Sequence, residues 1–381
     1  MKVLKFGGSS VATPDSIRQV KSIVQSQEDV IVVVVSALGG VTDELIKIAA
    51  LAESADASYL EKLQALRKRH IDTCDALVDA GKEGKLLRLA VDSLLNELDS
   101  ICRGVFLLKV LPEKTRDQIL SYGERLSSLI VTAAVGHAEQ YDSLEFIRTK
   151  NGLVDFEETD RLVAEKFAGY GKDSPVAIVP GFIARDRAGE IATLGRGGSD
   201  YTASILAAAL DASILEIWTD VDGFMSADPR IISNAYVIDE LTYEEATELC
   251  NFGAKVVYPP TLYPVCLKKI PIRVKNTFNP EAPGSLIHEA VPGKQDQRVI
   301  KGISSIYNIT IITLSATSMV GIIGVDQRIF TALASESINV FLVSQSASET
   351  GISIGVSTKD AEKACRVLSK TFAVEIARGA I

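Results

Sequence analysis

Short apolar runs alternate with amphipathic stretches through the first three quarters of the chain, which predicts an α/β fold. Residues 30–35 are apolar throughout, which is typical of a strand buried on both faces of a parallel sheet. The other predicted strands are 2–6, 144–148, 176–179, 191–194, 213–219 and 272–274. Glycine-containing loops follow the first two strands and lead into helices, so ligands are expected at the carboxyl ends of the strands.

Two other parts of the chain show different patterns. Leucines recur at helical spacing over about 43–130, which predicts an all-helical excursion from the sheet that acts as a lid or a subunit surface. Residues 279–300 are rich in proline and small residues, which predicts a linker. Beyond about 303 the order β-α-β-β-α predicts a compact ligand-binding or interaction module, with one more short strand at 372–376.

The composition narrows the class of protein. The 381 residues are 47% hydrophobic and carry a net charge of −9, which argues against nucleic acid or an anionic membrane as the main partner. No apolar run reaches membrane-spanning length and no signal peptide is evident, so a cytoplasmic enzyme is expected. The five cysteines lack metal-site spacing and the three histidines are isolated, which argues against a zinc site and a Ser-His-Asp triad.

The strongest candidate for chemistry is the loop Gly195-Arg196-Gly197-Gly198-Ser199-Asp200, which precedes an apolar helical run. Glycines ahead of a helix present free N–H groups and a positive dipole end to an anion, and Arg196 adds a fork that fits carboxylate or phosphate. Ser199 or Asp200 is the expected N-cap. Asp200 would repel an anion unless the loop also handles a metal ion or a catalytic lysine. The alternative is an ordinary glycine-rich turn with a capped helix.

Two further segments hold candidate charges. Lys5 precedes Gly7 and Gly8, so this is not a Walker A loop; we expect Lys5 to point at a phosphate with both glycine amides around it. The alternative is a surface lysine beside a tight turn. Gly123 and Glu124 lie in a helical segment, where glycine costs about 1 kcal/mol relative to alanine, so a close approach is suspected. The alternative is a packing glycine beside an exposed glutamate.

Taken together, six segments closely resemble aspartate kinase, a member of the amino acid kinase family. They are KFGGSSV (5–11), SYGE (121–124), GRGGSD (195–200), WTDVDG (218–223), DPR (228–230) and FGAKV (252–256). The resemblance covers essentially the whole chain. The tail from Ile303 resembles an ACT domain, most similar to that of the bifunctional aspartate kinase–homoserine dehydrogenases.

The resemblance implies an amino acid kinase fold, with a mostly parallel central sheet and helices on both faces, over residues 1–278. A linker (279–300) and a small α+β, ferredoxin-like ACT domain (301–381) follow. Aspartate kinases usually carry two ACT units, so the second unit is expected to be missing here, along with the dehydrogenase part. This chain is then expected to be part of a longer protein.

The implied reaction is ATP-dependent phosphorylation of the L-aspartate side chain to 4-phospho-L-aspartate, the first step toward lysine, threonine and methionine, with Mg²⁺ bound through ATP and not directly by the protein. The implied catalytic residues are Lys5, which stabilises the phosphoryl group, and Asp200, which orients Lys5. The implied substrate residues are Arg196 for the α-carboxylate, Glu124 for the α-ammonium, and Thr42, Phe182 and Ser199. The implied nucleotide residues are Lys5, Gly7, Gly8, Ser9, Thr219, Asp220, Phe224, Arg230 and Lys255.

The ACT segment implies feedback control, with threonine expected as effector ahead of lysine, and a homodimer formed through ACT. The implied effector residues are Met319, Gly324, Asp326, Asn339 and Gln345; for Gln345 the alternative is a strand-end polar residue. Two other functions stay open. One is a kinase of the same fold for another acyl substrate such as glutamate or acetylglutamate. The other is a non-catalytic sensor that binds an amino acid through its ACT unit.

Overall fold

The computed structural model of the protein describes residues 1–254, 256–290, 300–315, 323–348 and 350–379. The chain forms two compact units, Met1–Ser304 and Ser305–Ile381. The larger unit has two hydrophobic cores, one on each face of its main sheet, and the smaller unit has one. Each unit is described by itself below.

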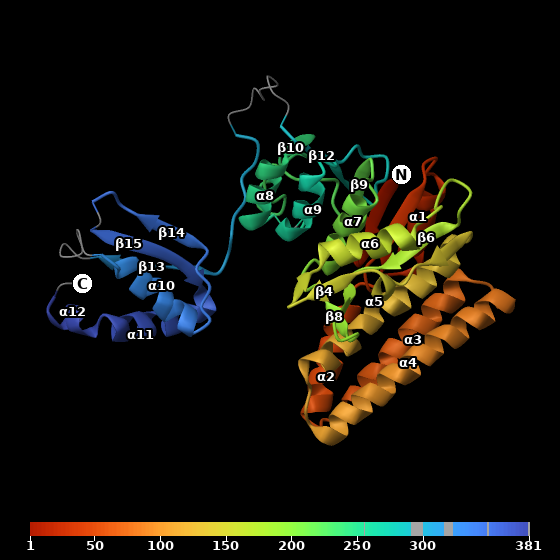
Figure 1. The fold of residues 1–381 in the computed structure, drawn as a ribbon, viewed down its shortest axis with the longest axis horizontal. Helices are drawn as coiled ribbons and strands as arrows, with labels where there is room; N and C mark the ends of the chain where they lie inside the picture. The colour runs from red at the N-terminus through yellow and green to blue at the C-terminus, as the bar shows by residue number, and fades with distance from the viewer. Residues whose placement is uncertain (255, 291–299, 316–322, 349, 380–381) are drawn as a thin grey trace. The chain divides into compact units, whose positions relative to one another are not determined.

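The larger unit is built on an eight-stranded sheet (Figure 1). In spatial order its strands are β10 (Glu240–Thr242), β12 (Ser285–His288), β11 (Ile272–Asn276), β9 (Ile214–Thr219), β1 (Lys2–Phe6), β2 (Ile31–Val35), β6 (Val176–Pro180) and β3 (Ala138–Gln140). The strands from β11 to β3 are all parallel, whereas β12 pairs antiparallel with β11 and parallel with β10. The predicted α/β fold with a mostly parallel sheet is therefore confirmed.

Helices cover both faces of this sheet. One face carries α1 (Pro14–Gln25), α2 (Val41–Glu53), α3 (Tyr59–Leu77), α4 (Lys82–Leu108) and α5 (Glu113–Val135). The other carries α6 (Phe156–Lys166), α7 (Gly198–Ala209), α8 (Tyr243–Asn251) and α9 (Leu262–Leu267). Strand β2 is buried on both sides, because Val33 and Val35 belong to the first core and Val32 and Val34 to the second.

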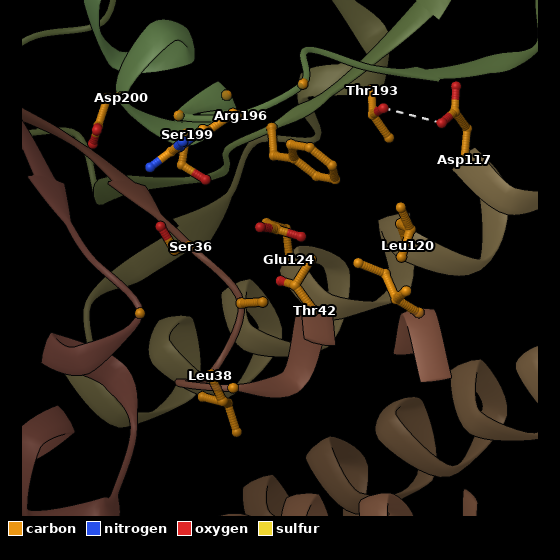
Figure 2. A pocket seen from close by; sticks show the side chains of 18 of the residues that line it. Ser36, Leu38, Thr42, Asp117, Leu120, Glu124, Thr193, Arg196, Ser199 and Asp200 are labelled. Atoms are coloured by element: carbon orange, nitrogen blue, oxygen red, sulfur yellow. Dashed lines mark hydrogen bonds between the residues drawn. The ribbon is translucent and has the colours of Figure 1, made fainter. Parts of the chain in front are cut away.

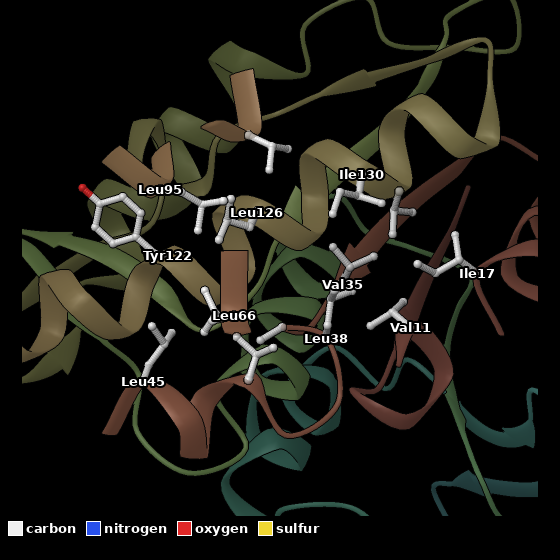
Figure 3. Packing of buried hydrophobic residues seen from close by; sticks show 14 of the residues in the cluster. Val11, Ile17, Val35, Leu38, Leu45, Leu66, Leu95, Tyr122, Leu126 and Ile130 are labelled. Atoms are coloured by element: carbon white, nitrogen blue, oxygen red, sulfur yellow. The ribbon is translucent and has the colours of Figure 1, made fainter. Parts of the chain in front are cut away.

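The segment predicted to be a helical excursion holds the four helices α2 to α5, of which α3 and α4 lie side by side (Figure 1). Their apolar stripes interlock in the first core, where Leu66, Leu95 and Leu126 are at most 1% exposed (Figure 3). The excursion is continuous with the packing under the sheet, since Leu38 and Val35 belong to the same cluster. The helical excursion therefore packs against the sheet and shares its hydrophobic core.

Two expectations about the larger unit need correction. The segment 279–300 is not all linker, because β12 lies within it; Gly284, at φ +77°, turns the chain back so that Leu286 and Ile287 pair with β11. The strand expected at 144–148 is instead a 3₁₀ turn, Ser143–Glu145, followed by β4 (Arg148–Lys150). Strand β4 belongs to a separate four-stranded sheet with β5 (Leu153–Val154), β7 (Ile183–Asp186) and β8 (Ile191–Thr193).

The smaller unit has the predicted β-α-β-β-α order. Its elements are β13 (Ile309–Ser315), α10 (Val325–Ser335), β14 (Leu342–Gln345), β15 (Gly351–Ser357) and α11 (Ala361–Thr371). The strands form an antiparallel sheet in the order β13-β15-β14. Its core joins Ile329 and Leu333 of α10 to Ile354 of β15 and Leu368 of α11.

The short strand expected at 372–376 is wrong, because the structure places a helix, α12 (Ala373–Ala377), there. The amide of Ile376 donates to the Phe372 carbonyl at 2.9 Å, which is a helical bond. Arg328 of α10 fixes this turn, since its guanidinium pairs with Glu375 at 2.6 Å and lies 4.3 Å from the centre of the Phe372 ring. The apolar pattern of residues 372–376 fits either a strand or a helix. The contacts of Arg328, which is distant in the sequence, favour the helix.

Among the described residues, none of the helices combines the length and apolar composition that crossing a membrane would need. All five cysteines are free thiols. Burial raises the pKa of Cys74 and of Cys102 to about 12, so both are inert packing residues.

Candidate active site

A cavity of about 560 Å³ lies at the carboxyl ends of the parallel strands. Its walls come from the segments that follow β1, β2, β6 and β8 and from the first half of α5. All the residues predicted for catalysis or substrate binding line it: Lys5, Thr42, Glu124, Phe182, Arg196, Ser199 and Asp200. Figure 2 shows Glu124 between Thr42 and the loop that carries Arg196 and Ser199. Side chains far apart in the sequence thus meet in one place.

The glycine-rich loop turns sharply into α7. Gly195 and Gly197 have φ of +72° and +70°, and a Cβ on Gly197 would lie 2.4 Å from the Cβ of Tyr258. Helix α7 begins at Gly198 with Gly197 as N-cap, so the expectation that Ser199 or Asp200 caps the helix is wrong. Both side chains lie in the first turn instead, where they line the cavity.

Phe182 is locked against this loop in a strained conformation. Its φ of +69° is unusual for a residue with a side chain. Its amide donates to the Thr202 hydroxyl at 3.0 Å, and that hydroxyl donates to the Gly198 carbonyl at 3.0 Å. A Cβ on Gly198 would lie 2.7 Å from the Phe182 ring, so only glycine allows this contact. These contacts keep Phe182 in its strained conformation, with the aromatic ring at the cavity wall.

Lys5 and Asp200 form an ion pair with 2.5 Å between Nζ and Oδ1. Their side chains are only 10% and 14% exposed, so solvent screens the pair weakly. The Gly7 amide donates to the Trp218 carbonyl at 3.0 Å, and this corrects the expectation that it faces a phosphate. Gly8 does line the cavity. Lys5 is therefore a buried cation held by a carboxylate at the end of a central strand.

Glu124 is a buried carboxyl group in the middle of α5. The residue is 4% exposed, and its Oε2 has no hydrogen-bond partner among the described residues. Burial raises the pKa of Glu124 to about 8, although the Ala37 amide, Lys5 and the Ser199 hydroxyl lower it in part. Neighbouring Gly123 is the predicted close approach, since a Cβ there would lie 2.8 Å from the Ala37 Cβ.

The segment after β2, where a ligand-binding loop was expected, contributes more of the cavity wall than Thr42, which is the one residue predicted there. The additional residues are Ser36, Ala37, Leu38, Gly39 and Gly40. Ser36 directly follows a buried parallel strand, so the rule that ligands bind at the carboxyl ends of strands could have identified it.

The first turns of α5 form the far wall and were also missed. Glu113, Arg116, Asp117 and Leu120 line the cavity there. The Thr193 hydroxyl donates to Asp117 at 3.0 Å and so ties β8 to this helix (Figure 2). No local signal marks these residues, because their place depends on how the helical excursion folds back.

Of the residues predicted for the nucleotide, Lys5 and Gly8 line the cavity, whereas the other described ones do not. Thr219 is the last residue of β9 and Asp220 follows it. Strand β9 pairs in parallel with β1, so both residues lie at the same edge of the sheet as Lys5. Neither is among the described residues that line the cavity. Arg230 is exposed and pairs with Asp228 at 2.8 Å. Ser9 begins a 3₁₀ turn beside Gly8.

Two more residues, Phe224 and Lys255, were predicted to contact the nucleotide. Phe224 is fully buried in the second core, and both its backbone groups are bonded, to the Ser285 hydroxyl at 2.7 Å and the Ile238 amide at 2.7 Å. The structure therefore gives Phe224 a packing role and corrects the expectation of a nucleotide contact. Lys255 lies outside the described residues.

The predicted effector residues belong to the smaller unit. Gly324, at φ +92°, is the N-cap of α10, and Asp326 lies in the first turn with its Oδ1 buried and without a partner among the described residues. Asn339 and Gln345 are exposed. Met319 lies outside the described residues.

Comparisons with known proteins identify the family of this chain. The model of the amino acid kinase family matches residues 1–276, and an ACT domain model matches residues 312–372. The bifunctional aspartokinase/homoserine dehydrogenase of Haemophilus influenzae is 34% identical over 99% of this chain and 47% of its own length. Chloroplastic aspartokinase 1 of Arabidopsis thaliana is 34% identical over 92% of this chain and 62% of its own length. The chain thus spans about half the length of these curated relatives.

Among solved structures, E. coli aspartokinase III in complex with aspartate and ADP superposes with a TM-score of 0.81. The match has 32% sequence identity and covers 94% of this chain and 79% of that one. The same enzyme in complex with lysine and aspartate gives a TM-score of 0.77 at 31% identity. The chain belongs to the amino acid kinase family and, within it, to the aspartokinases.

Proposed function

We propose that the larger unit phosphorylates the side-chain carboxylate of L-aspartate with ATP, giving 4-phospho-L-aspartate and ADP. The observation that carries this proposal is Glu124. A buried carboxyl group with an unpartnered oxygen, facing a cavity, is costly unless a cation completes it. The α-ammonium of an amino acid is such a cation, and it distinguishes a free amino acid from an N-acetylated one.

The other charges of the cavity suit the two carboxylates of the substrate. Arg196 offers a planar fork to the α-carboxylate from the loop ahead of α7. Thr42 and Ser199 add hydroxyl donors, and Phe182 closes one wall. The side-chain carboxylate is then directed toward Lys5. Because this carboxylate is already ionised at neutral pH, it attacks the γ-phosphorus without a general base.

Lys5 stabilises the charge that develops on the transferring phosphoryl group, and Asp200 holds the lysine in place at 2.5 Å. Thr219, Asp220 and Arg230 are the proposed nucleotide contacts, together with Gly8, Ser9 and Lys255. Among the described residues, no group of three His, Cys, Asp or Glu side chains could hold a metal ion alone. Mg²⁺ is proposed to arrive with ATP, as part of the substrate, and Asp200 is proposed to help organise the region that receives it.

The test is a coupled ADP-release assay, with the acyl phosphate trapped as its hydroxamate. Aspartate, glutamate and N-acetylaspartate are compared at equal concentration, with Lys5→Ala as the inactive control. We expect turnover with aspartate and none with N-acetylaspartate, which lacks the ammonium group. Equal kcat/KM for the acetylated acid would contradict the role of Glu124. Nucleotide binding without any turnover would favour a non-catalytic sensor.

We further propose that the smaller unit binds an amino-acid effector, threonine ahead of lysine, through Gly324, Asp326, Asn339, Gln345 and Met319. Asp326 supports this, because its unpartnered oxygen at the start of α10 could accept an ammonium group. We also propose that the native form is a homodimer joined through ACT units. Inhibition of wild type by either amino acid, lost in Asp326→Ala, tests the site, and analytical ultracentrifugation tests the dimer.

A further inference from the structure

Arg69 connects two loops of the candidate site although it does not line the cavity. It lies on α3, in the helical excursion. Its Nη2 donates to the Gly39 carbonyl at 2.7 Å and to the Ala12 carbonyl at 3.2 Å. Gly39 follows β2 and Ala12 follows β1, so a single guanidinium bridges the segments that leave the two central strands.

The two bridged segments carry a large part of the cavity wall. The first contains Gly8 and begins just after Lys5; the second runs from Ser36 to Gly40 and leads into Thr42. They touch each other directly, because a Cβ on Gly39 would lie 3.0 Å from the Gly8 carbonyl oxygen and 2.9 Å from the Ala12 Cβ. A shift of either segment therefore changes the distance between Lys5 and the substrate residues.

Arg69 occupies a position that helix stability alone would not favour. Ala12 and Gly39 each precede the N-cap of a helix, Thr13 for α1 and Gly40 for α2. The N-terminus of a helix is its positive end, so a cation there is normally unfavourable. Glu44, in the first turn of α2, lies 4.0 Å from the guanidinium and offsets this only in part. The two carbonyl oxygens are what hold the cation in this place.

We propose that Arg69 is a positioning residue that fixes the segment after β1 against the segment after β2 and so sets the geometry of phosphoryl transfer. This inference rests on the proposed kinase function. Hydrogen bonds from a charged donor to carbonyls are stronger than neutral ones, and a misplacement of about 1 Å can cost about 100-fold in rate. Through Arg69, the helical excursion thereby holds two segments of the candidate site in place.

The chain offers a closely matched control on the same helix. Arg67 is 32% exposed and Arg69 is 31% exposed. Arg67 bonds to Asp92 and Asn96 of α4, both at 2.7 Å, and so joins two helices. Arg67→Ala removes the same group and a similar number of bonds as Arg69→Ala, while it leaves both loops untouched.

The experiment compares wild type with Arg67→Ala, Arg69→Ala and Arg69→Lys. Amide hydrogen exchange is followed in peptides that cover 7–13 and 36–42, and kcat and KM are measured for aspartate and ATP. For Arg69→Ala we expect faster exchange in both peptides and a kcat/KM for aspartate that falls about 10- to 100-fold, with KM for aspartate raised. Arg67→Ala stays within twofold of wild type, and Arg69→Lys, which keeps the charge but not the fork, falls between the two.

Equal effects of the two alanine variants would overturn the proposal. So would a loss of kcat in Arg69→Ala that is fully explained by a smaller fraction of folded enzyme, which faster amide exchange in peptides throughout the chain would reveal. If Arg69→Ala does not fold, Arg69→Gln is measured in its place. A kcat/KM for Arg69→Gln equal to that of wild type would refute the inference. If wild type fails to phosphorylate aspartate, the proposed function is wrong, while the exchange of the two peptides still tests the bridge.

Discussion

Replacing Glu124 by Gln is expected to stabilise the ligand-free protein and, in the same variant, to remove most of its affinity for aspartate. Burial raises the pKa of Glu124 from its ordinary value of 4.5 to about 8. A carboxyl group whose pKa is higher in the folded state than in the unfolded state opposes folding wherever the unfolded chain ionises it. Glutamine has nearly the same shape and no charge to desolvate.

The sign and the pH window follow from these two pKa values. Below pH 4.5 the group is protonated in both states and has no effect on the free energy of unfolding. Between pH 4.5 and 8 the unfolded state loses its proton first, so stability falls as pH rises. Above pH 8 the cost levels off at about 5 kcal/mol, from 1.36 kcal/mol for each tenfold change in the ionisation constant.

Urea unfolding of wild type and Glu124→Gln at pH 5 and pH 8 measures this difference. We expect the variants to differ by less than about 1 kcal/mol at pH 5 and by several kcal/mol at pH 8, with Glu124→Gln the more stable. Glu113→Gln is the control, because Glu113 lies on the same helix and lines the same cavity but is exposed. Equal stabilities of wild type and Glu124→Gln at both pH values would refute the reasoning.

The same ionisation is expected to appear in catalysis, because only the charged form of Glu124 can bind an ammonium group. In wild type kcat/KM for aspartate should rise about tenfold per pH unit from pH 6 and level off near pH 8. In Glu124→Gln it should be lower by about 100-fold and independent of pH over this range. A wild-type profile with its inflection near pH 4.5 would show that Glu124 is not the group that binds substrate.

Three further outcomes are expected. Lys5→Ala should lower kcat about 10²- to 10³-fold, as measured by hydroxamate formation, and an unchanged kcat would remove Lys5 from the mechanism. Burial lowers the pKa of His70 to about 4, so wild type should lose about 3 kcal/mol of stability as pH falls from 6.5 to 4, and urea unfolding should show a smaller loss in His70→Leu. Gly197→Ala should reduce kcat/KM at least tenfold more than Gly195→Ala, because only the former meets Tyr258, and equal effects would show that φ alone matters.

The sequence alone predicted the sheet and the helical excursion because both rest on strong periodic patterns. The valine run before Ser36 could only be a strand buried on both faces, and the leucine spacing over 43–130 could only be helical. The strand expected at 372–376 failed for the opposite reason. Five residues fit either period, and the outcome was set by Arg328, a residue more than forty positions away.

The candidate site was predictable where a motif carries its own chemistry. Lys5, Arg196 and Asp200 belong to glycine-containing motifs, and the structure places all three on one cavity. Phe224 and the Gly7 amide were wrongly predicted to contact the nucleotide. A motif does not reveal whether a side chain is buried in a core or whether an amide already donates to a backbone carbonyl. Asp117 and Arg69 were invisible, since their roles depend only on which helix lies next to which loop.

Glu124 shows why the helical excursion matters to the site. A carboxyl group in the middle of a helix reaches the cavity only because Gly123 lets α5 approach the Ala37 loop within contact distance. The packing that fixes Glu124 at the cavity also excludes water from it. This burial disfavours the charged carboxylate and raises its pKa. Under the proposed function, an amino-acid ammonium group would stabilise the charged carboxylate, whereas a neutral ligand would not. Selectivity for a free amino acid would then follow from the burial of Glu124, without any further contact.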